Sequence, residues 1–388
     1  MCTRRSFLAA SLAGMTATGA SLPLLRWGLS PSEGMLDRDG PLAPEVRALL
    51  ERHLRLWEDS SPLNLQGLRA QNPEWDFMSR TFLALAFACA GLREPNRRYL
   101  QAMDRIIEDT LATEASRGMH HFLLPYSKRA PFADPGGRSL FIDGEIAVMM
   151  GCRRLLEDTP RWQEPFAERI RFIAESLSRG PIGSGESYPD ECWSFCNSFG
   201  LLALRMSEAL DGDSHRERID TWLHMAREHL IDPATGLLVS SYSWDGRHLD
   251  GPEGSSLFLT AHNLRLLDPA LGVEQYARGK QALGRSFLGF GFSREWPASW
   301  VGPTDIDSGP IVPVLQGSPS ASGFMILAAR SFNDEPTFRS LVSALNLVGV
   351  PKTTHGARRF LASNAIGDAV ITYALVAGPL FAEIAQRC

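Results

Sequence analysis

Apolar residues recur three and four positions apart through most of this 388-residue chain, and strict alternation of apolar and polar residues is scarce. Such spacing places apolar side chains on one face of an α-helix, whereas a β-strand needs a period of two. The chain is therefore predicted to be all-α. About twelve helices are expected, at 44–57, 77–91, 96–117, 140–157, 165–179, 192–210, 215–230, 255–267, 273–287, 320–332, 335–348 and 365–386.

Two kinds of helix alternate along the chain. Some are charged and amphipathic, such as 216–230, and others are apolar and rich in small residues, such as 82–91 and 199–206. Packing assigns the first kind to an outer layer and the second to an inner layer. Six outer–inner pairs predict an (α/α)6 toroid of six helical hairpins. A helical solenoid is the alternative, but no regular repeat of about 34–47 residues is visible.

The composition is that of an ordinary globular protein. Apolar residues make up 44% and charged residues 21%, and no low-complexity tract divides the chain, so residues 31–388 are predicted to form one domain. The net charge is −5, with lysines and arginines scattered singly. Because phosphate neutralisation needs a basic surface, nucleic acid is not an expected partner.

The N-terminus has the features of an export signal. Arg4 and Arg5 precede Phe7-Leu8 and an Ala-rich apolar stretch at 9–25, and no acidic residue occurs before Glu33. This pattern is typical of a twin-arginine signal, so 1–30 is read as signal and linker. The prediction is transport by the twin-arginine export machinery to the periplasm or beyond. The alternative is an ordinary amphipathic N-terminal helix.

Cysteine usage argues against a disulfide scaffold or a metal site. Cys2 lies in the leader, which leaves an odd set without framework spacing: Cys89, Cys152, Cys192, Cys196 and Cys388. No second Cys or His pair stands at zinc-ligand spacing. No metal is therefore expected.

The densest group of reactive side chains spans 186–197. Pro189 predicts a turn, Asp190 is expected to cap the next helix, and Cys192 and Cys196 fall four positions apart on one helical face. At a helix N-terminus the Cys196 thiol could have a lowered pKa and act as an acid or base. The alternative is that both cysteines are small apolar core residues.

This part of the chain resembles the linalool dehydratase/isomerase family. The resemblance is carried by Pro189-Asp190 with Cys196-Asn197-Ser198, then by 229–233 (His-Leu-Ile-Asp-Pro), 240–242 (Ser-Ser-Tyr) and 267–270 (Leu-Asp-Pro-Ala). It implies an (α/α)6 toroid that dehydrates or isomerises a tertiary terpene alcohol without a cofactor, by acid–base groups in an apolar pocket.

Several family positions are substituted. Cys196 matches the second family cysteine and Asp190 the acidic residue before it, whereas Ser187 replaces the first cysteine and Glu145 the histidine. Leu257 stands near the later family tyrosine, and Asp59 is a candidate for the N-terminal acidic residue. The resemblance therefore supports the predicted fold more strongly than it supports the predicted reaction.

The carboxylates suggest a second interpretation. Glu145 with Asp190 or Asp307 could supply the acid–base pair that glycoside hydrolases and polysaccharide lyases use. Trp193, Tyr242, Trp244, Trp296 and Trp300 could stack on sugar rings. Asp307 lies in the Gly/Pro-rich segment 302–310, where calcium binding is disfavoured because no acidic residues follow at ligand spacing.

The main hypothesis is a lyase or isomerase acting on a small, largely apolar alcohol, with Cys196, Asp190 and Glu145 facing one enclosed space. The alternatives are a carbohydrate-active enzyme and a non-catalytic binding toroid, and formation of a homo-oligomer is left open. The candidate catalytic residues are Cys196, Asp190, Glu145 and Asp307, and the candidate substrate-binding residues are Tyr188, Trp193, Asn197, Tyr242, Trp296 and Asp143.

Overall fold

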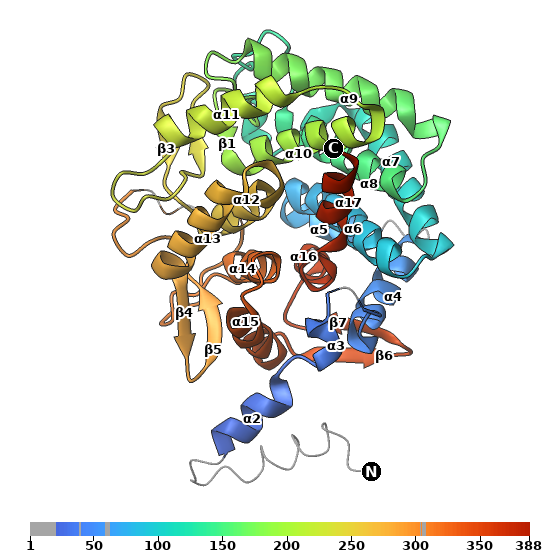
Figure 1. Ribbon diagram of the computed structural model, residues 1–388, viewed down its shortest axis with the longest axis vertical. Coiled ribbons are helices and arrows are strands. Elements are labelled where there is room, and N and C mark those ends of the chain that lie inside the picture. The colour runs from blue at the N-terminus through green and yellow to red at the C-terminus, as the bar shows by residue number, and fades with distance from the viewer. Residues whose placement is uncertain (1–20, 39, 59–62, 303, 305–307) are drawn as a thin grey trace.

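The computed structural model describes residues 21–38, 40–58, 63–302, 304 and 308–388, and these residues form a mainly helical structure (Figure 1). The twin-arginine motif, Asp59 and Asp307 lie outside the described residues.

Six helices form an inner ring. They are α6 (Pro73–Arg93), α8 (Leu140–Leu156), α10 (Ser194–Asp211), α12 (Gly254–Leu267), α14 (Pro319–Ser331) and α16 (Ala365–Val376). Each contacts the next, and α16 contacts α6, which closes the ring (Figure 1). Inner helices are buried on all sides: in α8 every residue except Leu156 is buried.

Six further helices surround this ring. They are α4 (Pro44–Glu58), α7 (Arg97–Arg117), α9 (Pro160–Arg179), α11 (Arg216–His229), α13 (Pro269–Leu283) and α15 (Glu335–Val348). Only five of the 14 residues of α11 are buried, because an outer helix buries one face and exposes the other. The alternation of the two helix types thus confirms the predicted (α/α)6 toroid. Because an outer helix separates successive inner helices, the inner helices run parallel and their N-termini meet at one end.

Short elements connect or flank the ring. The helices are α2 (Ser21–Leu29), α3 (Glu33–Leu36), α5 (Leu63–Gln71), η1 (Met119–His121), η2 (Pro125–Lys128) and α17 (Pro379–Arg387). An antiparallel sheet is formed by β1 (Cys192–Trp193), β2 (Ser241–Tyr242) and β3 (His248–Asp250). Two hairpins pair β4 (Gly284–Phe287) with β5 (Phe290–Ser293), and β6 (Pro351–Thr354) with β7 (Ala357–Phe360).

Several predicted helix ends were wrong. The helices expected to begin at 77, 165 and 273 begin earlier, at Pro73, Pro160 and Pro269, and three further differences have a structural cause. The helix expected to reach residue 287 ends at Leu283, because 284–287 pair with β5. The helix expected over 365–386 is broken into α16 and α17, since Gly378 adopts φ 148° and Pro379 cannot continue a helix hydrogen-bond ladder. The helix expected from Cys192 begins at Ser194, because residues 192–193 pair with β2.

Aromatic side chains fill the axis of the ring. The ring of Phe82 lies 6.2 Å from that of Phe199, 5.5 Å from that of Phe324 and 6.2 Å from that of Tyr373. At the opposite end from the inner N-termini, α17 packs on α6 and α10, and Phe381 stacks on His262. One end of the ring is therefore covered by α17, and the N-termini of the inner helices converge at the other end.

No single helix among the described residues has the length and apolarity to cross a bilayer, although α16 and α17 meet that test as a pair bent by 63°.

Candidate active site

Glu145 lies in the second turn of α8 and is fully buried. Its Oε2 atom accepts a 2.5 Å hydrogen bond from the Thr81 hydroxyl of α6, while its Oε1 atom has no partner among the described residues. Burial raises the pKa of Glu145 to about 8; the Thr81 hydrogen bond opposes this rise and the charge of Glu74 adds to it. The side chain is therefore a neutral carboxylic acid at pH 7 and can donate a proton.

Cys196 lies in the first turn of α10 and is 6% exposed. Its thiol hydrogen-bonds Ser187, and the carboxyl groups of Glu145, Glu74 and Glu191 lie near it. Burial raises the pKa of Cys196 well above its ordinary value; the Ser187 hydrogen bond opposes this rise, and the ionised forms of the three carboxyl groups add to it. The predicted lowering of this pKa is thus wrong, because desolvation and three carboxylates outweigh the position at a helix N-terminus.

Tyr188 connects this region to α6. Its hydroxyl donates a hydrogen bond to Glu74 in the first turn of α6 and accepts one of 3.0 Å from the Leu124 amide. Its ring stacks on Tyr126 with centroids 4.6 Å apart. Burial raises the pKa of Tyr188, and the Glu74 charge adds to the rise. The tyrosine therefore remains protonated and fixes the position of Glu74.

Glu191 provides another carboxylate in the turn before α10. It accepts hydrogen bonds from the Tyr126 hydroxyl at 3.2 Å and from the indole nitrogen of Trp193. Glu74 and Glu191 are both half-buried, and neither was among the predicted site residues. The only signal for Glu74 was its place after Asn72-Pro73, at the start of an inner helix, where side chains converge.

Asp190 does not join Cys196 and Glu145. It is exposed, its backbone has φ 55°, and its carboxylate accepts a 3.1 Å hydrogen bond from the Trp244 amide. Nor does it cap α10, whose N-cap residue is Trp193. The expectation that all three side chains face one space is therefore corrected: the tight turn directs Asp190 toward solvent.

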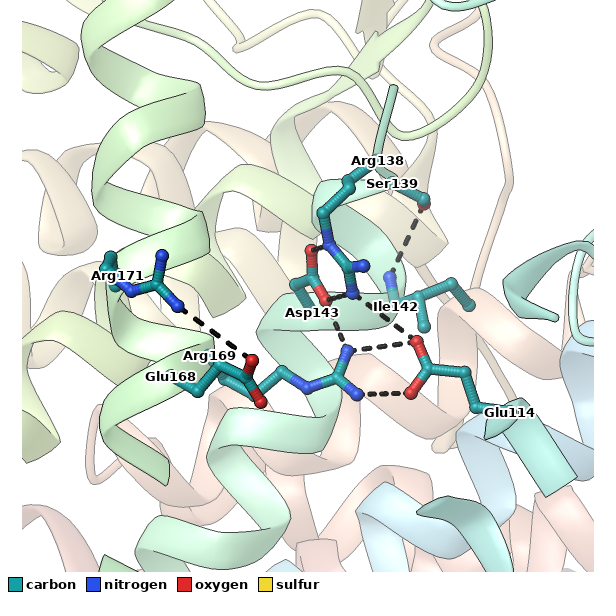
Figure 2. Close-up of polar contacts among 8 residues, drawn as sticks. All are labelled: Glu114, Arg138, Ser139, Ile142, Asp143, Glu168, Arg169 and Arg171. Carbon is teal, nitrogen blue, oxygen red and sulfur yellow. Dashed lines mark hydrogen bonds and ion pairs between the residues drawn. The ribbon is translucent and has the colours of Figure 1, made fainter. Parts of the chain in front are cut away.

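Asp143 lies in a buried ion-pair network (Figure 2). Its carboxylate contacts Arg138 and Arg169, each at 2.5 Å, and both arginines also contact Glu114. The network joins α7, α8 and α9. Because both oxygens of Asp143 accept from arginine, this residue holds the toroid together and is not available to a substrate.

Two other predicted substrate-binding residues have their polar groups satisfied by the protein. The Asn197 amide exchanges hydrogen bonds of 3.0 Å with the backbone of Gly185. The fully buried Tyr242 hydroxyl contacts Ser184 at 2.9 Å and Trp222 at 3.2 Å. Both residues therefore order the loops around α10.

Trp296 lies in a different sector of the same end. It lines a pocket of about 490 Å³, which we name the Arg294 pocket. The pocket is lined by Arg294, Glu295, Trp296, Pro297, Trp300, Thr304, Ile311, Pro313 and Gln316. Among the described residues, no group of three or more His, Cys, Asp or Glu side chains is arranged to hold a metal ion.

The fold is shared with solved glycoside hydrolases. A GH76A α-1,6-mannanase from Salegentibacter sp. matches with TM-score 0.55 and 11% identity over 87% of this chain and 99% of that chain. A possible GH105 member from Salmonella enterica matches with TM-score 0.56 and 12% identity over 89% and 95% of the two chains. An unsaturated glucuronyl hydrolase with the saccharide dGlcA-Glc-Rha-Glc matches with TM-score 0.54 and 9% identity over 85% and 94%.

These similarities define the chain as a six-hairpin (α/α)6 toroid like those of the GH76 and GH105 enzymes. No protein-family model matches the sequence. Nothing in these comparisons assigns the chain to the linalool dehydratase/isomerase family.

Proposed function

We propose that this protein is an exported carbohydrate-active enzyme that cleaves a glycosidic bond by acid–base catalysis. The observation that carries the proposal is Glu145, whose pKa of about 8 keeps it protonated at neutral pH while one of its oxygens lacks a partner among the described residues. A general acid must be protonated at the working pH to give its proton to the leaving-group oxygen.

The second carboxylate of such a mechanism is assigned to Glu74. The Tyr188 hydroxyl orients Glu74, and the negative charge of Glu74 raises the pKa values of Glu145 and Cys196. Two carboxyl groups in different environments can divide the roles of acid and base. In this assignment Glu145 protonates the departing oxygen and Glu74 removes a proton from the attacking water. The glycosidase activities of fold neighbours with α-1,6-mannanase and unsaturated glucuronyl hydrolase names support the same class.

The test is a reducing-end assay on neutral α-mannosides and on oligosaccharides that contain uronic acid. Glu145→Gln should lower kcat by about 10²–10⁴-fold, the usual contribution of general acid–base catalysis. Cys196→Ser, at the neighbouring buried position, should retain activity. The wild-type rate should fall as the pH rises through about 8, because Glu145 then loses its proton. Full activity of Glu145→Gln would refute the assignment.

A second candidate is a cofactor-independent hydro-lyase or isomerase acting on a small alcohol. One observation favours it: Ser187, Cys196 and Glu145, which stand at the positions of the family cysteines and histidine, lie together around the buried Cys196 thiol. Incubation with terpene alcohols and analysis of the products tests this candidate. Cys196→Ser should abolish that activity and leave glycoside cleavage intact, so the same variant separates the two proposals.

Export is proposed from the leader sequence. Replacing Arg4 and Arg5 with lysine should strongly reduce the protein outside the cytoplasm, as measured by cell fractionation. Unchanged export of the doubly substituted protein would contradict the twin-arginine route.

A further inference from the structure

The Arg294 pocket lies where the N-termini of α12 and α14 meet. Glu295 joins these two inner helices, since its Oε1 atom accepts from the Ser255 amide at 2.9 Å and from the Ser255 hydroxyl at 2.5 Å, while Oε2 accepts from the Ser318 hydroxyl. Glu295 is 1% exposed. This pocket wall is therefore fixed by the framework of the ring.

Arg294 is the unusual side chain of this pocket. Its guanidinium makes no hydrogen bond or ion pair with any residue that the structure describes, and its Nε atom is buried without a partner. The neighbouring Glu295 does not form an ion pair with Arg294: its two oxygens point to Ser255 and Ser318 instead. A buried guanidinium nitrogen without a partner is costly, and a carboxylate is the group that its planar fork binds best.

A second cation lies near Arg294. Burial lowers the pKa of Arg285, and the charge of Arg294 lowers it further. The Arg285 guanidinium is occupied by the carbonyls of Gly284 at 2.7 Å and Ala282 at 3.0 Å. It thus adds positive potential while Arg294 remains available for contact.

The pocket also offers an aromatic surface. The Trp300 ring lies against the backbone at Gly251 and Gly302, where an added Cβ would come within 2.5 Å and 2.1 Å of the ring. Only glycine allows this close approach, so the loops that contain Gly251 and Gly302 fix the position of the Trp300 ring. Trp296 lines the same pocket. Flat aromatic rings next to a cation suit a ring-shaped ligand that carries a carboxylate.

We infer that the Arg294 pocket binds a uronic acid residue of a saccharide, with the sugar carboxylate on Arg294 and the sugar ring against Trp300 and Trp296. This inference rests on the proposed function for the saccharide nature of the ligand and deepens it by naming an acidic substrate class. It is independent of which carboxyl group performs the catalysis.

Binding is measured without turnover, by calorimetry and tryptophan fluorescence of the full chain titrated with digalacturonate and, in parallel, with the neutral mannobiose. Digalacturonate should bind more tightly, and its affinity should fall as salt screens the ion pair. Arg294→Gln should weaken digalacturonate binding by about tenfold or more, because it removes a charge-assisted hydrogen bond. The matched control Arg285→Gln should change it by less than about threefold.

Glu145→Gln separates this inference from the proposed function. It should lower kcat for glycoside cleavage by about 10²–10⁴-fold and leave digalacturonate binding unchanged. Equal affinity of wild type and Arg294→Gln, equal affinity for the acidic and neutral disaccharides, or affinity that does not change with salt would each overturn the inference. Because the salt series uses the wild-type protein, the test holds even where Arg294→Gln lowers stability.

Discussion

The hydroxyl of Thr81 on α6 donates a hydrogen bond to Glu145 on α8 across the interface of two inner helices, with 2.5 Å between the oxygens. This single hydrogen bond does not compensate for complete burial of the carboxyl group. The pKa of Glu145 therefore stays near 8, and the group is neutral where an ordinary glutamate is ionised.

The first prediction concerns stability against pH. The folded pKa of Glu145 is about 8, above the unfolded value of about 4.3. Between these two pH values only the folded state holds the proton. As the pH rises, the free energy of unfolding of the wild type therefore falls by up to about 1.4 kcal/mol per pH unit relative to that of Glu145→Gln. Urea unfolding of both proteins from pH 7 to 9 measures this difference, which should level off above pH 8. A matched variant of an exposed helical residue, Glu164→Gln, should run parallel to wild type; a constant difference for Glu145→Gln would contradict the assigned pKa.

The second prediction concerns the ion-pair network of Figure 2. Arg169 is 7% exposed and contacts Asp143 and Glu114, whereas the nearby Arg171 is exposed and lies 3.8 Å from Glu168. Arg169→Ala leaves the carboxylates of Asp143 and Glu114 to share Arg138 alone and should lower the free energy of unfolding by about 3–5 kcal/mol. Arg171→Ala should change it by less than about 1 kcal/mol. Similar losses for the two variants in urea unfolding would refute the structural role of the network.

The third prediction concerns thiol reactivity. Cys89, Cys152, Cys192 and Cys196 are buried with raised pKa values, and Cys388 is exposed. In a Cys2→Ser background, an aromatic disulfide reagent at pH 7.5 should titrate one thiol quickly in the native protein and five after denaturation. Adding Cys388→Ser should remove the fast phase. A fast phase that persists, and that is then lost on Cys196→Ser, would show that Cys196 is a reactive thiolate and would favour the lyase alternative.

The fourth prediction concerns Glu295, which joins the N-termini of α12 and α14. Glu295→Ala leaves the buried Ser255 amide and the Ser318 hydroxyl without their acceptors and should cost about 3 kcal/mol or more. Glu295→Gln keeps an acceptor oxygen and should cost less. Thermal and urea unfolding measure both, and an unaffected Glu295→Ala protein would show that the link does not stabilise the ring.

Helical periodicity and the alternation of helix types were enough to predict the toroid, because these patterns depend on neighbouring residues. The errors occurred where distant segments decide the structure. Residues 284–287 leave the helical pattern to pair with 290–293, and Cys192 leaves it to pair with Tyr242. No local preference of Cys192 indicates that partner, which lies fifty residues further along the chain.

The candidate site was predicted in part. Glu145 and Cys196 stand on inner helices and lie together in the structure, as their positions in the pattern indicated. Asp190 was misplaced because a positive φ in a tight turn reverses the direction of its side chain. Glu74 and Glu191 were missed because each is an ordinary glutamate until Tyr188, Tyr126 and Trp193 bind it.

The sequence by itself determined the helices, their inner or outer placement and the supply of carboxyl, thiol and aromatic groups at one end, since amphipathic periodicity is a local property of the chain. Only the tertiary structure decided which of these groups are charged. Burial by other helices makes Glu145 a neutral acid, keeps Cys196 a thiol and leaves Arg294 without a partner among the described residues. Desolvation depends on atoms that folding brings from remote parts of the chain, so the spacing of residues in the sequence does not predict it.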